Sequence, residues 1–247
     1  MKTFISQYNS ISADLIREKI YSRSEQDVEN ALVRKKRSLD DFIAMISPAA
    51  MPYLEEMARL SHLATKRRFG KTIQMYNPLY LSNECSNCCT YCGFNHTNKI
   101  ERLTLNEDQI LNEALALKNL GYEHILLVTG ESDKKAGFKY LKRALEIVKP
   151  HFSLVSMEVQ PLSEDEYREL VSIGLNTVYI YQETYQKQPY QLYHPAGKKA
   201  DFLWRLETPD RLGRAGAYKI GLGVLLGLED WRIESFYLAS HISWLEK

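Results

Sequence analysis

The strongest constraint on the fold is a repeated alternation, after residue 73, between short apolar segments and longer amphipathic segments. The longer segments repeat apolar residues at helical spacing, and polar residues or glycines bound them. Buried strands that alternate with helices predict an α/β fold with a parallel sheet and right-handed crossovers, as in a barrel or an open doubly wound sheet. The strands are expected at residues 74–81, 125–128, 152–160, 177–181 and 220–226.

Capping residues mark several of the expected helix starts. Thr104 and Glu107 have the spacing of a capping box, and Ser163 and Glu166 repeat it. Thr208 is a favourable N-cap, because a proline follows it at the first helical position. These signals predict where the helices that connect successive strands begin.

The beginning of the chain has a different pattern. Apolar residues recur there at helical spacing without intervening strands, so we expect an N-terminal helical segment at 1–72 and a (β/α) domain at 73–247. That domain holds about five βα units and a last helix at 231–245, whereas a complete (β/α)₈ barrel needs about 250 residues for itself. The sequence therefore predicts a partial barrel whose C-terminal part is apparently missing.

The charges of the chain nearly cancel, with 32 Lys and Arg residues against 31 Asp and Glu residues. Such a balance gives no long-range field to attract nucleic acid or an anionic membrane, so neither is an expected partner. The first residues lack a basic run followed by an apolar core, and no apolar stretch is long enough to cross a bilayer. The expected location is the cytoplasm.

All four cysteines lie within one eight-residue window, where clustered thiols bind metal more often than they form a disulfide framework. Cys85, Cys89 and Cys92 have the spacing C-x₃-C-x₂-C. One compact loop can place these three thiolates on three corners of an iron–sulfur cubane, which leaves the fourth iron free to bind a small molecule. Cys88 directly precedes Cys89, and adjacent side chains in an extended loop diverge, so Cys88 is expected to be a spare thiol.

A zinc site is the alternative interpretation of these cysteines. All four thiols could bind zinc, or Cys85, Cys89 and Cys92 could bind it together with His96. Structural zinc sites usually take ligand pairs from two separate segments, and this sequence has no second pair. The iron–sulfur interpretation is therefore favoured.

The C-x₃-C-x-aromatic-C pattern, with Tyr91 as the aromatic residue, resembles the signature of the radical S-adenosylmethionine (SAM) superfamily. In that superfamily the cysteine loop follows the first strand of a partial or complete (β/α) barrel. The rest of the chain resembles one branch, the 2-iminoacetate synthases, whose members are longer and continue beyond the fifth expected strand. The resembling stretches are residues 80–85, 127–131, 157–161, 181–185 and 201–212.

This resemblance implies an activity, cofactors and partners. The cofactors would be a 4Fe-4S cluster and SAM, and the reaction would cleave the Cα–Cβ bond of L-tyrosine to give 2-iminoacetate (dehydroglycine) and p-cresol for the thiazole of thiamine. A thiazole synthase would receive the product, and a flavodoxin or ferredoxin-type protein would donate electrons. Another radical SAM lyase of aromatic amino acids, of the hydrogenase-maturation type, and a non-catalytic zinc-binding scaffold remain as alternatives.

The resemblance also implies contacts with the amino group and the ribose of SAM. Tyr91 belongs to the signature itself, and the segment Thr129, Gly130 and Glu131 corresponds to the one that receives the SAM amino group, although a glycine-containing turn there is common. The ribose would bind polar residues at the ends of the third and fourth strands, among which Glu183 is the best candidate. These strand-end residues are Glu158, Gln160, Gln182 and Glu183.

The remaining implied contacts are a cation for the SAM carboxylate and a surface for the adenine. The cation would be Lys199, Arg205 or Arg211, although surface salt bridges are the expected role for at least two of the three. The adenine would lie against the fifth strand, where small residues leave room for a flat ring. The residues implied for this contact are Gly223, Leu225 and Gly227.

Overall fold

The computed structural model describes residues 3–247, and this part of the chain divides into two compact units. One unit comprises residues 3–5 and 75–225, and the other comprises residues 6–74 and 226–247. The expected boundary between residues 72 and 73 separates the chain in a similar place. The predicted division differs at both ends of the chain. Residues 3–5 belong to the unit that holds the strands, and residues 226–247 belong to the unit of the N-terminal helices.

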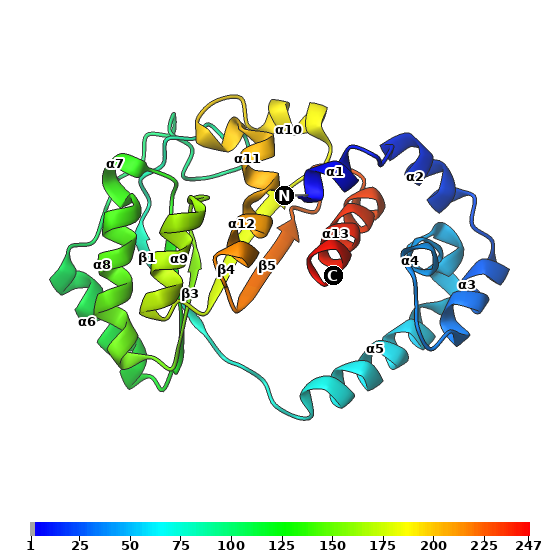
Figure 1. Cartoon of the computed structure of the whole chain (residues 1–247), viewed down its shortest axis with the longest axis horizontal. Helices are drawn as coiled ribbons and strands as arrows, with labels where there is room; N and C mark the ends of the chain where they lie inside the picture. Colours follow the sequence, from blue (N-terminus) through cyan, green and yellow to red (C-terminus); the bar gives the residue numbers. More distant parts are fainter. Residues whose placement is uncertain (1–2) are drawn as a thin grey trace. The chain divides into compact units, whose positions relative to one another are not determined.

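The first unit is built on a sheet of five parallel strands, which lie in chain order from β1 to β5 (Figure 1). This confirms the predicted parallel α/β architecture, a partial barrel with one helical connection after another. The strands are β1 (Asn77–Ser82), β2 (His124–Thr129), β3 (Leu154–Glu158), β4 (Thr177–Glu183) and β5 (Lys219–Val224).

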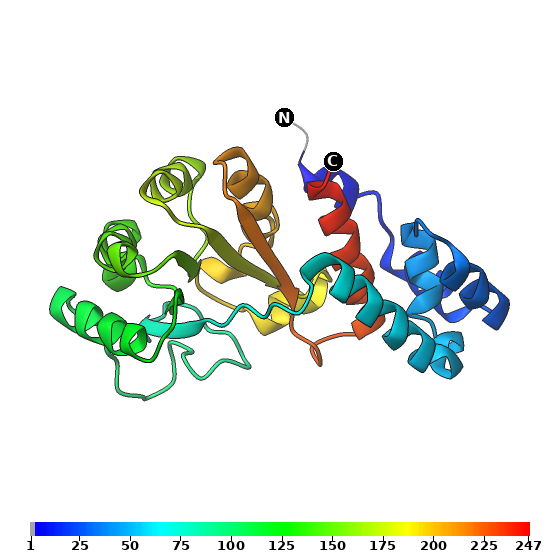
Figure 2. The same cartoon turned by 90° about the horizontal axis from the view of Figure 1, so that it is seen from below.

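Helices connect the strands and lie along one side of the sheet, as the green, yellow-green and orange ribbons in Figure 2 show. One face of α8 is fully buried in the core, through Leu141, Ala144, Leu145 and Val148. The helices of this unit are α6 (Glu107–Asn119), α7 (Asp133–Ala136), α8 (Phe138–Val148), α9 (Glu164–Ile173), α10 (Lys187–Tyr193), α11 (Phe202–Leu206) and α12 (Thr208–Arg214), with short 3₁₀ turns η2 (Lys149–His151) and η3 (Lys198–Ala200).

The two faces of the sheet carry different side chains, because successive residues of a strand point to opposite faces. On the helix-covered face, apolar side chains such as Leu127, Met157 and Ile180 form the core. On the other face, Glu158 of β3 pairs in register with Tyr179 of β4, so polar and aromatic groups share that side. The helix-covered face of the sheet thus carries the main apolar core, and the other face carries polar groups that can build a site.

The start of α6 differs from the prediction. Asn106 caps this helix and Gln109 completes its capping box, rather than Thr104 and Glu107. The Thr104 hydroxyl instead lies 2.8 Å from the Ser82 hydroxyl, in an isolated bridge beside the end of β1. The sequence has capping-box spacing both at Thr104 and Glu107 and at Asn106 and Gln109. The contact of Thr104 with Ser82 leaves Asn106 as the cap.

The start of α12 also differs from the prediction. Thr208 is the first helical residue rather than the cap, and its hydroxyl donates to the Trp204 carbonyl at 2.9 Å. The N-cap position belongs to Glu207, which makes no capping bond through its side chain. The proline signal therefore placed this helix within one residue.

The predicted capping box of α9 is confirmed, since the Ser163 hydroxyl accepts from Glu166 N–H and the Glu166 carboxylate accepts from Ser163 N–H. Ser163→Ala is therefore expected to lower the free energy of unfolding by about 1 kcal/mol. Urea titration followed by circular dichroism measures this loss. Ser172→Ala, at an exposed position of the same helix, is the control and should stay within about 0.5 kcal/mol of the native protein. An equal loss in both variants would remove the capping explanation.

The second unit is helical. One buried apolar cluster joins Val28, Ala31 and Leu32 of one helix to Ala44 of the next and to Ala50. The last helix packs with the second and fourth helices, which explains why the C-terminal segment groups with the N-terminal one. The helices are α2 (Ala13–Tyr21), α3 (Glu25–Val33), α4 (Leu39–Met45), α5 (Leu54–Phe69) and α13 (Trp231–Leu245), with the 3₁₀ turn η1 (Pro48–Tyr53); α1 (Phe4–Tyr8) has residues in both units.

Within residues 3–247, no helix combines the length and the apolar character that a bilayer span requires.

Candidate functional site

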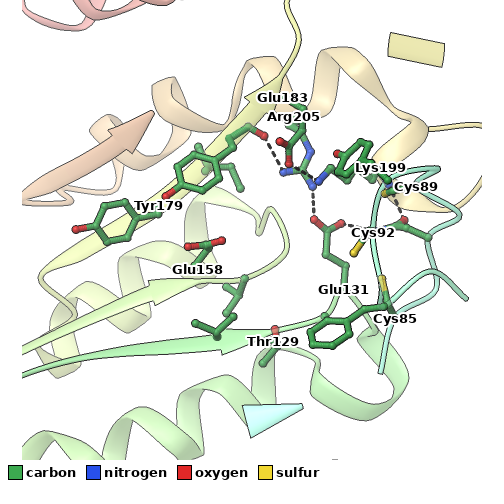
Figure 3. Close-up of a pocket in the computed structure, with 18 of the residues that line it drawn as sticks. Cys85, Cys89, Cys92, Thr129, Glu131, Glu158, Tyr179, Glu183, Lys199 and Arg205 are labelled. Carbon is green, nitrogen blue, oxygen red and sulfur yellow. Dashed lines mark hydrogen bonds and ion pairs between the residues drawn. The ribbon is translucent and has the colours of Figure 1, made fainter. Parts of the chain in front are cut away.

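A cavity lies at the C-terminal ends of the strands of the first unit, on the face that the helices leave open. Active sites of (β/α) barrels form at this end, because the loops that follow the strands converge there. Figure 3 shows polar side chains from three strand ends and three thiols around one space. The lining residues that the argument below uses are Cys85, Asn87, Cys89, Tyr91, Cys92, Thr129, Gly130, Glu131, Glu158, Tyr179, Tyr181, Glu183, Lys199 and Arg205.

The structure places three of the four cysteines in this cavity. Cys85, Cys89 and Cys92 line it, whereas Cys88 does not. The Cys88 backbone N–H donates to the Ala196 carbonyl at 3.1 Å. Burial raises the pKa of the Cys89 thiol to about 11, so without metal this group is a neutral thiol and would release a proton on binding iron.

His96, the fourth ligand of the alternative zinc set, has its ring turned to the backbone. Its Nδ1 lies 3.1 Å from the Cys85 carbonyl oxygen. Across the described chain, residues 3–247, no three His, Cys, Asp or Glu side chains are placed to hold one metal ion. A single zinc ion needs ligands that converge on one point, whereas a cubane takes each thiolate at a different corner.

The end of β2 anchors the cysteine loop. The Ser86 N–H and hydroxyl both donate to the Glu131 carbonyl oxygen at 2.9 Å. The Asn87 amide donates to the Glu131 carboxylate at 2.9 Å. A Cβ at Gly130 would lie 2.4 Å from the Glu84 carbonyl oxygen, so only glycine lets the strand end approach the loop this closely.

Glu131 and Arg205 form a buried ion pair across the cavity, which Figure 3 shows between the ends of the two side chains. Burial alone would raise the pKa of Glu131, but Arg205 and Lys199 outweigh it and hold that pKa below its usual 4.5. Another Arg205 nitrogen donates to the Tyr181 carbonyl at 3.2 Å. Each carboxylate oxygen of Glu131 thus has a protein partner, Arg205 or Asn87, and its contact with the SAM amino group stays a prediction.

A second, partly buried pair joins Lys199 to Glu183. The two side chains are 13% and 12% exposed and their charged atoms lie 2.6 Å apart. Glu183 has a backbone φ of +70°, where β4 ends in an irregularity of its pairing with β5. Strained backbone of this kind in a residue other than glycine clusters at functional sites.

The expectation that at least two of the three candidate cations make surface salt bridges is wrong. Arg205 and Lys199 pair inside the cavity, and Arg211 is buried away from it. Arg211 donates to the Trp204 carbonyl at 2.8 Å and stacks 3.5 Å above the Trp204 ring. Arg211 therefore has a structural role, because its hydrogen bonds to the backbone and its stacking leave it outside the site.

The four polar residues at the ends of β3 and β4 divide into two pairs. Glu158 and Glu183 line the cavity, and burial raises the pKa of Glu158 with the help of the Glu183 carboxylate. Gln160 points elsewhere and donates to the Ala136 carbonyl at 2.8 Å, and the buried Gln182 is also outside the lining. The alternation of side chains along a strand separates Glu183 from its neighbour Gln182.

Gly223, Leu225 and Gly227, which were predicted to contact the adenine, are not among the residues that line the cavity, and their contact with SAM stays a prediction. A Cβ at Gly223 would lie 2.5 Å from the ring of Tyr181, its partner in the neighbouring strand. Glycine at this position therefore leaves room for the Tyr181 ring, which lines the cavity. Gly227 lies beyond the strand, at a turn with φ of +103°.

The sequence analysis missed residues that complete the site. Asn87 and Tyr179 line the cavity directly. His194 does not line it, but its Nε2 lies 2.8 Å from the hydroxyl of the lining residue Tyr91. Asn87 carried a usable signal, since it lies between two of the cysteines. His194 carried none, because 103 residues separate it from its partner Tyr91 in the sequence.

The comparison with protein families matches residues 79–238 to the model described as the radical SAM superfamily. The chain belongs to the radical SAM superfamily. The matched region contains all four cysteines and every strand except the first two residues of β1. Membership gives this radical SAM protein its cofactors, a 4Fe-4S cluster and SAM.

Among curated proteins, the 2-iminoacetate synthase of Escherichia coli K12 is 50% identical over 248 residues, which cover 100% of this chain and 66% of that protein. The chain thus spans about two thirds of the length of this relative. A 3-methylornithine synthase of Methanosarcina acetivorans is 28% identical and is matched over 76% of this chain and 53% of its own. Among solved structures, the FeFe-hydrogenase maturase HydG superposes with a TM-score of 0.88 and 26% identity, over 94% of this chain and 54% of that one.

The cavity of this radical SAM protein fits a polar ligand beside a cluster. Two buried polar atoms in its lining residues, Thr129 Oγ1 and Arg205 Nε, have no hydrogen-bond partner among the described residues. Buried polar atoms normally have partners, because leaving one unpaired costs about 1–3 kcal/mol. SAM carries carboxylate, amino and hydroxyl groups that could satisfy such atoms, and three thiols border the same space.

Proposed function

We propose that this radical SAM protein is a lyase that cleaves the Cα–Cβ bond of L-tyrosine to 2-iminoacetate and p-cresol. The observation that carries the proposal is the 50% identity over the whole chain to a protein named 2-iminoacetate synthase. The convergence of three thiols and several charged side chains on one cavity supports it. The chain spans 66% of the length of that relative. The relative's activity is therefore proposed for this chain.

In this proposal Cys85, Cys89 and Cys92 hold the cluster and Cys88 does not. All three proposed ligands border the cavity, and only they among the four cysteines do so. When bound, the cluster and SAM supply the one-electron chemistry that removes a hydrogen atom from the substrate. The thiolates also need protection from water, which the surrounding loop and strand ends provide by burying Cys89.

The charged side chains of the cavity would orient SAM and the substrate. Lys199 is a candidate for the SAM carboxylate, because its side chain lines the cavity and its ammonium group lies there 2.6 Å from Glu183. Arg205 offers an unpaired Nε–H to the same kind of acceptor. Thr129, Gly130 and Glu158 remain proposed contacts of SAM, as do Tyr91, Glu131 and Glu183, and the aromatic walls at Tyr179 and Tyr181 would exclude water from the reacting groups.

We further propose two protein partners on the basis of the resemblance. A thiazole synthase would take up 2-iminoacetate, because an imine of this kind hydrolyses readily in water. A flavodoxin or ferredoxin-type donor would reduce the cluster. The hydrogenase-maturation type of lyase is the second candidate function, favoured by the TM-score of 0.88 to HydG, but its sequence identity of 26% is lower than the 50% to the 2-iminoacetate synthase.

The test is oxygen-free reconstitution of the chain with iron, sulfide, SAM, a reductant and L-tyrosine. The expected result is release of 5′-deoxyadenosine together with p-cresol, measured by liquid chromatography and mass spectrometry. Release of 5′-deoxyadenosine without p-cresol would reject the tyrosine assignment and keep the superfamily chemistry. Release of cyanide with p-cresol would favour the second candidate.

A further inference from the structure

The segment of residues 193–199, here called the strap, runs alongside the cluster loop, which comprises residues 85–92. Thr90 N–H donates to the Tyr193 carbonyl at 3.0 Å, and Cys88 N–H donates to the Ala196 carbonyl at 3.1 Å. Lys199 N–H donates to the Asn87 side-chain oxygen at 2.9 Å. Three hydrogen bonds spread along both segments hold the strap against the cluster loop.

Gly197 allows the strap to lie this close to the loop. Its φ is +92°, and a Cβ there would lie 2.3 Å from Asn87 Oδ1 and 2.6 Å from Asn87 Cα. An L-residue would be strained at this φ and would also collide with the backbone of the loop. Glycine at position 197 is therefore required for the close contact between the strap and the cluster loop.

His194 adds a side-chain contact to these backbone bonds. It is 1% exposed, its Nδ1 lies 2.8 Å from the Tyr190 carbonyl oxygen, and its Nε2 lies 2.8 Å from the Tyr91 hydroxyl. A carbonyl oxygen can only accept, so Nδ1 carries the hydrogen and Nε2 accepts one from Tyr91. Burial lowers the pKa of His194 to about 4, which keeps the ring neutral and this direction of donation intact near neutral pH.

The partner of His194 occupies a sensitive place. Tyr91 lies between Cys89 and Cys92 in the sequence and lines the cavity. Its ring meets the His194 ring edge-on, with centroids 5.6 Å apart, and lies 5.8 Å from the Lys199 ammonium nitrogen. Holding the Tyr91 side chain in place therefore restrains one wall of the cavity. It also restrains the backbone between Cys89 and Cys92.

We propose that His194 is a positioning residue, which holds the cluster loop in its cluster-bearing geometry before iron and SAM bind by accepting the hydrogen bond of Tyr91. The proposal rests on the proposed assignment of Cys85, Cys89 and Cys92 to the cluster. Preorganisation of this kind is how supporting residues usually act on ligands of a metal site. His194 does not line the cavity, so its effect must pass through Tyr91.

The experiment compares His194→Phe, which keeps a flat ring but cannot accept, with His194→Gln, whose side-chain oxygen can replace Nε2. In the metal-free protein, His194→Phe is expected to speed amide hydrogen exchange of Cys88 and Thr90 about tenfold, because the strap and the loop separate more often. After reconstitution, the SAM-induced change in the electron paramagnetic resonance spectrum of the reduced cluster should need about tenfold more SAM. His194→Gln should stay within about twofold of the native protein in both measurements.

His124→Phe is the matched control, because His124 is also buried and bonds Ser156 Oγ at 2.6 Å, outside the loop and the strap. It should leave the exchange of Thr90 unchanged. Native exchange and native SAM titration in His194→Phe would overturn the proposal, and so would equal damage in His194→Phe and His194→Gln, which would indicate packing alone. Neither measurement contains tyrosine, so absence of p-cresol in the activity assay would reject the proposed reaction without affecting this result.

Discussion

Cys89→Ala is expected to abolish the release of 5′-deoxyadenosine and p-cresol, whereas Cys88→Ala should leave both products at native levels. The two side chains are neighbours in the sequence, but only Cys89 lines the cavity. Two remaining thiolates cannot hold a cubane at three corners, so the cluster should be lost with Cys89. Product release and bound iron, measured on the same oxygen-free samples, check this expectation.

The Cys88 variant is the matched control, because it removes the same chemical group one residue away. Its backbone N–H, which donates to Ala196, is unaffected by the change of side chain. The reverse pattern, with iron lost from Cys88→Ala and kept in Cys89→Ala, would show that the cluster uses a different set of thiols. Zinc in place of iron in the native protein would support the scaffold alternative.

Arg205→Met is expected to lower the free energy of unfolding of the metal-free chain by about 3–5 kcal/mol. The substitution leaves the Glu131 carboxylate buried without its cation, and breaking a buried pair from one side costs about this much. Arg143→Met is the control, because the pair between Arg143 and Glu107 is exposed and screened by water, so its loss should be much smaller. Urea titration at pH 7 followed by circular dichroism measures both losses.

The double variant Arg205→Met/Glu131→Leu separates the lost charge from lost packing. Removing both partners should recover most of the stability, because no buried charge is then unpaired. Failure of the double variant to recover would contradict the electrostatic explanation. The folded-state pKa of Glu131 lies below 4.5, so the stability that this pair contributes is complete above that pH and is lost as the pH falls through the folded-state value.

Much of the fold of this radical SAM protein could be predicted because strands and helices depend on residues close together in the chain. The expected strand at 177–181 became β4 (Thr177–Glu183), and the last helix was predicted at the bounds of α13 (Trp231–Leu245). Ser163 marked the start of α9 because a capping box is completed within three residues. The cysteine loop was likewise evident because its ligands are close in sequence.

The candidate site could be predicted only in part, because its contacts join distant segments. The strand ends were recognisable, but their pattern did not say whether Glu183 or Gln182 faces the cavity, since this depends on which face of the sheet the helices cover. The sequence likewise did not show that the register of β4 and β5 places the Tyr181 ring against Gly223.

The sequence by itself determined the βα alternation, the cysteine spacing and the resemblance to the radical SAM superfamily, because each is written in short-range order along the chain. Only the tertiary structure decided that Arg205 pairs with Glu131 across 74 residues and that His194 holds Tyr91. It also decided that the C-terminal helix joins the N-terminal unit. These pairings depend on strand register and on which groups folding removes from water, and neither is set by the residues next to them in the sequence.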